Sequence, residues 1–143
     1  MEVRELPEGE TRLAHAAMRA LRPAYGAEAE FVERVDRVQR PEGYRLVASF
    51  AAGREAAAAA GFRTGHNLSW GRYLYVDDLS TAPDARRQGH GAALLRWLDA
   101  EARRLGCDQL HLDSGTQPER FAAHRLYYDE GLAIIAHHFA RVL

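Results

Sequence analysis

Residues 91–105 carry the most regular amphipathic pattern of the chain. Their apolar positions recur every three or four residues, which predicts a helix that packs one face against a sheet. These positions are Gly91, Leu94, Leu95, Leu98, Ala102 and Leu105. Gly106 follows, where helices commonly end on a glycine. Strand-like runs at residues 72–80 and 109–114 flank this helix, so the three segments predict a βαβ unit with parallel strands and a right-handed connection.

The remaining segments predict further strands and helices around this unit. A hairpin is expected to turn at Ala52 and Gly53. The alanine run at residues 56–60 favours a helix by propensity, but too few residues separate Gly53 from Gly61 for a stable helix, so we predict a strand. The expected strands are 1–6, 44–51, 55–63 and 133–142, the expected helices are 10–21, 27–39 and 118–130, and the expected loop is 65–71. Together they predict one α+β domain with a mixed sheet, antiparallel early and parallel at its centre.

Composition predicts a soluble protein. Of the 143 residues, 47% are hydrophobic and 27% are charged, and the formal net charge is −1. No broad basic surface is therefore expected to bind nucleic acid or an anionic membrane. The lone Cys107 excludes an internal disulfide and fits a reducing cytoplasm. We find no long apolar stretch and no signal-peptide pattern, so we expect a cytoplasmic protein.

The six residues Arg86-Arg87-Gln88-Gly89-His90-Gly91 lie where the predicted helix begins. The first N–H groups of a helix lack partners within the helix, and the helix dipole favours negative charge there. Glycine allows close backbone approach or an unusual φ, and the guanidinium group of arginine suits phosphate oxygens. The segment therefore predicts a loop that binds phosphate groups.

This pattern, Arg86-x-x-Gly89-x-Gly91, resembles the acyl-CoA pyrophosphate loop of the GNAT superfamily of N-acetyltransferases. The resemblance extends over residues 70–143. It implies a GNAT-like fold, with a sheet of six or seven strands that is splayed at its parallel centre and flanked by about four helices. It also implies acetyl-CoA as co-substrate.

In this family, main-chain groups of the strand before the loop bind the pantetheine arm of the cofactor, at a bulge that splays two strands. The matching positions are Leu79, Ser80 and Thr81 for the arm, and Arg86, Arg87, Gln88, Gly89, His90, Gly91 and Ala92 for the diphosphate. The alternative is that Leu79 is a core residue and that Ser80 and Thr81 form an ordinary strand end, but the adjoining loop favours cofactor binding. No metal is expected, because the seven histidines show no paired ligand spacing.

Tyr127 is the main candidate for a catalytic side chain. Acyl transfer to an amine expels a thiolate, which a positioned acid can protonate. The resemblance assigns this role to a tyrosine of the late helix, and Tyr127 followed by Gly131 matches it, although Leu126 and Leu132 stand where phenylalanine is common. Tyr128 points about 100° away on a helix, so only one of the two can serve. The alternative is that both are amphipathic aromatics at the edge of the core.

Asp77 and Asp78 are candidates for binding or deprotonating the amine. They interrupt an otherwise apolar run, where an unpaired buried carboxylate would be costly. One faces each side of the strand unless a bulge intervenes. A structural hydrogen bond is an equally good explanation. Asp113 at the end of the next parallel strand and His138 are weaker candidates for the substrate pocket.

The predicted reaction is transfer of an acetyl group from acetyl-CoA to a primary amine, by direct attack in a ternary complex. A covalent intermediate is not expected, because Cys107 and the serines show no nucleophile-base arrangement. A rival is a non-catalytic acyl-CoA-binding or sensing module on the same fold. A nucleotide-binding protein is a weaker rival, because the chain has no lysine for the usual phosphate loop. The acceptor is a small-molecule or peptide amine whose identity is left open. Whether the chain forms a homodimer is also left open.

Overall fold

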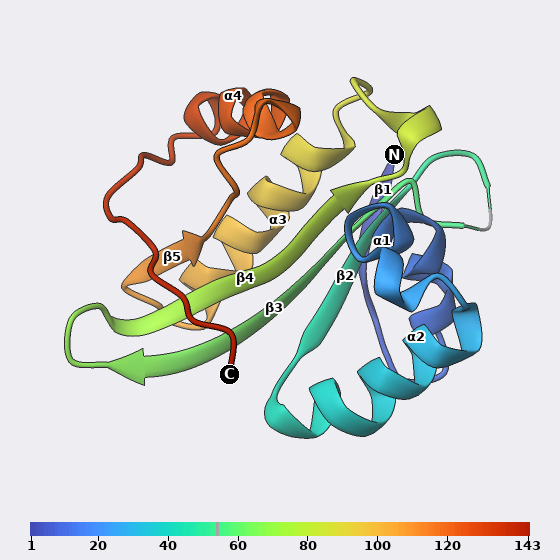
Figure 1. Ribbon diagram of the computed structural model, residues 1–143, viewed down its shortest axis with the longest axis horizontal. Helices are drawn as coiled ribbons and strands as arrows, with labels where there is room; N and C mark the ends of the chain where they lie inside the picture. Colours follow the sequence, from blue (N-terminus) through green and yellow to red (C-terminus); the bar gives the residue numbers. More distant parts are fainter. Residues whose placement is uncertain (54) are drawn as a thin grey trace. The chain divides into compact units, whose positions relative to one another are not determined.

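The computed structural model describes residues 1–53 and 55–143, in two compact units, Met1–Leu112 and Asp113–Leu143. The described part of the first unit holds one mixed sheet with helices packed on it (Figure 1). Its strands are β1 (Glu2–Leu6), β2 (Arg45–Phe50), β3 (Ala58–Asn67), β4 (Gly71–Thr81) and β5 (Gln109–Leu112), and its α-helices are α1 (His15–Leu21), α2 (Glu28–Arg34) and α3 (His90–Arg104). The second unit contains α4 (Phe121–Asp129).

The strands lie in the order β1-β2-β3-β4-β5. Neighbours from β1 to β4 are antiparallel, and β4 pairs in parallel with β5, so the predicted βαβ unit around α3 is confirmed. The α+β class with a mixed sheet is also confirmed. The parallel pair lies at the edge of the described sheet instead of its centre, because β5 is the last strand in the order.

Helices cover both faces of this sheet, because the strand side chains alternate between two cores. On β2, Leu46 and Ala48 pack in the cluster that contains the buried apolar residues of α1 and α2. Val47 points the other way and packs in the cluster that contains Leu94 and Leu98 of α3. The amphipathic stripe predicted for residues 91–105 is thus the face that α3 buries.

A bulge in β4 reverses which face its side chains point to. The register with β3 runs Phe62–Val76 and then Gly61–Asp78, so Asp77 is an extra residue on β4. Before the bulge, Val76 packs in the α3 cluster, and after it Leu79 packs against that cluster. Without the extra residue Asp78 would point into the α3 core. The bulge therefore keeps both aspartates out of that core.

Two predicted segments differ from the structure. The final strand expected at residues 133–142 is absent, and the described chain has five strands instead of six or seven. Strand-like composition is a local signal, but a strand needs a pairing partner, and apolar residues of this segment such as Ile134 and Phe139 remain exposed. The loop expected at residues 65–71 is mostly strand, because β3 and β4 extend into a tight turn in which Asn67 Oδ1 accepts a hydrogen bond from Trp70 N at 2.6 Å.

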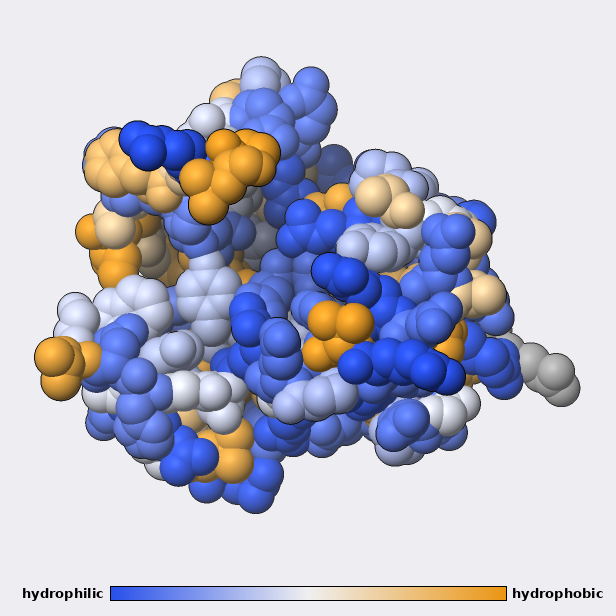
Figure 2. All heavy atoms as spheres, turned by 60° about the horizontal axis from the view of Figure 1, so that its bottom comes forward, coloured by the Kyte–Doolittle hydropathy of each residue, from blue (hydrophilic) through white to orange (hydrophobic). Residues whose placement is uncertain are grey.

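The face shown in Figure 2 is mostly hydrophilic, with separate hydrophobic spots. Within residues 1–53 and 55–143, no helix has the length and apolar character needed to cross a bilayer.

Candidate functional site

The turn between β4 and α3 is exposed and adopts two left-handed backbone conformations. Arg87 has φ 63° and Gly89 has φ 86°. Residues 86–89 are all exposed. Alternation of left-handed residues with others turns successive N–H groups toward one side and forms an anion-binding concavity. Arg87 is the only non-glycine residue with a positive φ in the described chain, and such strain is concentrated at functional positions.

The first turn of α3 leaves its amide groups without a cap. The first helical hydrogen bond runs from Ala93 N to Gly89 O at 3.0 Å, so the N–H groups of His90, Gly91 and Ala92 have no acceptor within the helix. Gly89 at the N-cap cannot cap them with a side chain, and no side-chain cap is present. The Gln88 side chain turns back to donate to Asp84 O at 3.1 Å. These free donors and the helix dipole suit an anion such as a diphosphate.

His90 itself points into the protein. Its side chain is buried, and its Nδ1 shares a 2.8 Å hydrogen bond with Oγ of Ser49, a fully buried residue on β2. Of the seven loop residues predicted to bind cofactor, His90 can therefore contribute only its backbone. Gly91 and Ala92, which follow it in α3, also present their backbone amides.

Beyond the bulge, β4 has an open edge. The parallel ladder with β5 ends at Val76–Leu112, so the later residues of β4 pair with β3 alone among the described strands. Ala82 N donates to Ala57 O on the β3 side at 2.8 Å. Because backbone direction alternates, the N–H and C=O groups of Thr81 and Leu79 face the open side. A chain-like ligand with amide groups can bind there as an added strand would.

Ser80 differs from its two neighbours. Its side chain is buried, and its Oγ donates to Ala17 O of α1 at 2.7 Å. Its backbone faces β3, by the same alternation. Of the three strand residues predicted to bind the cofactor arm, the geometry therefore offers Leu79 and Thr81 and uses Ser80 to hold α1.

Both aspartates of the bulge are ion-paired. Asp77 accepts hydrogen bonds from Arg63 Nε at 2.7 Å and from Arg63 Nη2 at 3.0 Å. Asp78 accepts from Arg22 Nε at 2.7 Å and from the Tyr44 hydroxyl at 2.9 Å. The acidic pair is thus neutralised by two arginines, one of which follows α1.

Gly61 makes room for the Tyr44 ring beside Asp78. A Cβ atom at Gly61 would lie 1.6 Å from the Tyr44 hydroxyl oxygen, so no other residue fits there without moving the ring. The pKa of Tyr44 is raised well above its usual value, first by burial and then by the charge of Asp78. Tyr44 therefore stays protonated and donates to Asp78.

In the second unit, Tyr127 is buried and Tyr128 is exposed. Arg120 Nη2 donates to the Tyr127 hydroxyl at the long distance of 3.5 Å. Burial raises the pKa of Tyr127, and the charge of Arg120 opposes this shift. The phenol is therefore protonated at neutral pH, as an acid must be.

The second unit also brings together the two weaker candidates. His138 Nδ1 lies 3.3 Å from Asp113 Oδ2, and both side chains are more than half exposed. His124, close to Tyr127 in sequence, instead bonds through Nε2 to Gly115 O at 2.8 Å and Ser114 Oγ at 3.1 Å. His124 therefore holds its own helix to the preceding segment.

Sequence reasoning missed the partners of the predicted site residues. Arg22, Tyr44 and Arg63 contact the bulge aspartates, and Ser49 contacts His90. One signal was available: a glycine inside a strand, Gly61, indicates close approach by another group.

Comparisons with known proteins show the family and the fold of the chain. The model of the acetyltransferase (GNAT) family matches residues 11–131. No curated protein matches the sequence.

Solved structures share the fold at low sequence identity. A ribosomal-protein-alanine N-acetyltransferase from Brucella melitensis biovar Abortus 2308 has a TM-score of 0.83 and 16% identity, with 100% of both chains covered. The aminoglycoside N-acetyltransferase AAC(6')-Iy in complex with CoA has a TM-score of 0.82 and 12% identity, covering 99% of this chain and 93% of that one. An acetyltransferase from Trypanosoma brucei has a TM-score of 0.77 and 20% identity, with 99% of both chains covered. This chain belongs to the GNAT family of acetyltransferases.

Proposed function

We propose that this protein transfers an acetyl group from acetyl-CoA to a primary amine, by direct attack in a ternary complex. The observation that carries the proposal lies in the first unit. There the uncapped amides of His90, Gly91 and Ala92 follow, after one short turn, the open backbone edge at Leu79 and Thr81. One site suits a diphosphate and the other suits an amide-containing arm, and CoA contains both.

The thioester is proposed to lie along the open edge of β4. There a free main-chain N–H can donate to the thioester carbonyl, and this bond strengthens as the oxygen gains negative charge in the tetrahedral intermediate. A solved neighbour in complex with CoA supports binding of this cofactor by the fold.

Tyr127 is proposed as the acid that protonates the departing thiolate. Its raised pKa supports the role, because the phenol carries its proton at neutral pH. The approach of Tyr127 to the sulfur is inferred from the family resemblance.

Asp78 is proposed to meet the incoming amine. Its partner Arg22 belongs to residues 10–39, which the family resemblance assigns to the acceptor wall. An ammonium group can compete with Arg22, whose side chain is 50% exposed, for the carboxylate. Asp77 is the weaker proposal for the same role, because Arg63 occupies both of its oxygens. Asp113 and His138 stay proposals for the rim of the acceptor pocket.

The acceptor is proposed to be a small-molecule or peptide amine. One structural neighbour is an aminoglycoside N-acetyltransferase, and another is a ribosomal-protein-alanine N-acetyltransferase. Both names support nitrogen as the acceptor atom.

A turnover screen over amine classes tests the proposal, with release of free CoA as the readout. Tyr127→Phe is expected to lower kcat by about tenfold to a hundredfold and to leave CoA affinity unchanged. Tyr128→Phe is the matched control, one position along the same helix, and is expected to keep the wild-type rate. Equal rates for Tyr127→Phe and wild type would exclude the acid role. CoA binding with no turnover of any amine would favour the non-catalytic binding module.

A further inference from the structure

We propose that the buried Ser49–His90 hydrogen bond is a positioning device for the CoA diphosphate loop, and this rests on the proposed function. The two residues are 0% and 3% exposed, and their bond joins β2 to the first residue of α3. The proposal is that this bond sets the place of the amides that follow Gly89. The side chains of His90 and Ser49 act here by placing the backbone of the first turn, and they do not touch the ligand themselves.

The need for such a device follows from how α3 packs. Leu94 and Leu98 of α3 pack in the apolar core against the sheet. Apolar packing is non-directional and tolerates a small slide or rotation of the helix. A hydrogen bond is directional, and it confines the donor–acceptor distance to a range of a few tenths of an ångström. A bond at the first residue therefore controls the orientation of the first turn more closely than the apolar face can.

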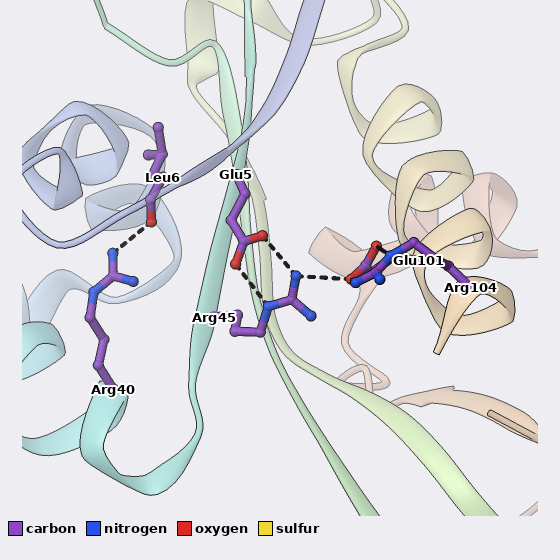
Figure 3. Close-up of polar contacts among 6 residues, drawn as sticks. All are labelled: Glu5, Leu6, Arg40, Arg45, Glu101 and Arg104. Carbon is purple, nitrogen blue, oxygen red and sulfur yellow. Dashed lines mark hydrogen bonds and ion pairs between the residues drawn. The ribbon is translucent and has the colours of Figure 1, made fainter. Parts of the chain in front are cut away.

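The same strand also holds the far end of α3. Arg45, on the same face of β2 as Ser49, donates from Nη2 to Glu101 Oε1 at 2.9 Å (Figure 3). Four residues of strand span about 13 Å, and eleven residues of helix span about 16 Å. The two polar bonds therefore lie at similar spacings on both elements, and together they fix the axial position and the rotation of α3 on β2.

The first turn has no other polar restraint of its own in the described structure. Gly89 supplies no cap, residues 86–89 are exposed, and the Gln88 side chain bonds back to the preceding turn. A ligand that binds several amides needs them placed before it arrives, since ordering them on binding would weaken affinity. The Ser49–His90 bond supplies this placement from the protein interior.

The test separates positioning from stability by removing one partner and then both. Ser49→Ala leaves a buried imidazole nitrogen without its partner, so both the melting temperature and CoA affinity should fall. The double variant Ser49→Ala/His90→Leu replaces the polar pair by apolar groups, which should restore most of the melting temperature. CoA affinity should stay about three- to tenfold below wild type in both variants, because neither has the directional bond.

Isothermal titration with CoA and steady-state rates supply the readouts. The KM for acetyl-CoA should rise with the dissociation constant, whereas kcat at saturating acetyl-CoA should change less than about twofold. Thr11→Val is the matched control. It removes another buried hydroxyl, whose 2.6 Å hydrogen bond to Asp36 Oδ1 does not involve α3. This variant should keep wild-type CoA affinity.

Two results would overturn the inference, and they are distinguishable. If wild type binds CoA and the stable double variant binds it equally well, the pair has no positioning role and the proposed function stands. If wild type fails to bind CoA, the proposed function fails, and this inference fails with it.

Discussion

The two ends of α3 differ in whether their terminal backbone groups form hydrogen bonds within the chain. At the C-terminal end, Gly106 N donates to Arg103 O at 3.0 Å and Cys107 N donates to Ala102 O at 2.9 Å, so the last carbonyls find partners within the chain. At the N-terminal end no side chain caps the amides. The difference teaches that one end satisfies its backbone groups within the chain, whereas the other leaves donors that can bind the proposed ligand.

The charges follow the same division. Near the C-terminal end, Glu101 is buried and accepts hydrogen bonds from Arg45 and from Arg104 (Figure 3). Near the N-terminal end, Arg86 and Arg87 are exposed on the turn. Compensated charge supports the fold at one end, and the other end can attract an anion.

The largest expected effect comes from replacing the glycine at the ligand end. Gly89→Ala forces a Cβ onto a residue with φ 86°, which costs about 1–2 kcal/mol of stability or moves the turn. Because the amides follow this turn, CoA affinity should fall about tenfold to a hundredfold. Titration calorimetry and thermal melting measure the two effects.

Gly106→Ala is the matched control at the other end of the same helix. Gly106 has φ 70°, and a Cβ there would meet no atom within 4 Å. It should lower stability by a similar amount, about 1–2 kcal/mol, and leave CoA affinity unchanged. Equal losses of CoA affinity in the two variants would break the comparison.

A stability effect without a binding effect is expected from Glu101→Gln. The change leaves Arg45 and Arg104 with a weaker acceptor, and the free energy of unfolding should fall by about 2 kcal/mol. Asp99→Asn, which breaks only the exposed pair with Arg103, should cost less than about 0.5 kcal/mol. Urea unfolding distinguishes them, and a larger loss in Asp99→Asn would contradict the role given to Glu101.

Acid should weaken the same end of the helix. Hydrogen bonding, first from Arg104 and also from Arg45, lowers the pKa of Glu101 from 4.5 to about 2, against the effect of burial. A carboxyl with a lowered folded-state pKa stabilises the protein above its unfolded-state pKa, and this contribution disappears as the pH falls from about 5 to about 2. Between pH 6 and pH 3, the free energy of unfolding should therefore fall by about 1 kcal/mol less in Glu101→Gln than in wild type. Parallel slopes for the two proteins in urea titrations would show that Glu101 does not carry this dependence.

The smallest effect tests the strain at the ligand end. Arg87→Gly should raise stability by about 0.5 kcal/mol. Glycine adopts φ 63° without strain, and the strain that is removed outweighs the extra chain entropy that glycine loses on folding. Arg86→Gly is the control, since Arg86 has φ −64° and has no left-handed strain to relieve. CoA affinity should fall in Arg87→Gly. A variant of Arg87 that loses stability and keeps its CoA affinity would show that this residue serves the fold only.

Local sequence patterns predicted α3 and its loop because their signals lie within a few turns of chain. The period of the apolar residues, the glycines and the adjacent arginines all act over short distances. The Ser49–His90 bond joins residues 41 positions apart, and the Arg22–Asp78 bond joins residues 56 apart, so no local pattern indicates either. The absent strand at residues 133–142 has the same cause, because strand formation depends on a distant partner. The family resemblance implies a bulge in this part of β4, but its extra residue, Asp77, is defined only by pairing with β3.

Backbone amide chemical shifts recorded while CoA is added test the central claim most directly. The account predicts that the amides of His90, Gly91 and Ala92 shift strongly and saturate with the CoA dissociation constant, whereas those of Leu105 and Gly106 at the other end hardly move. CoA that binds and saturates while the amides of the first turn of α3 keep their free-state shifts would contradict the account.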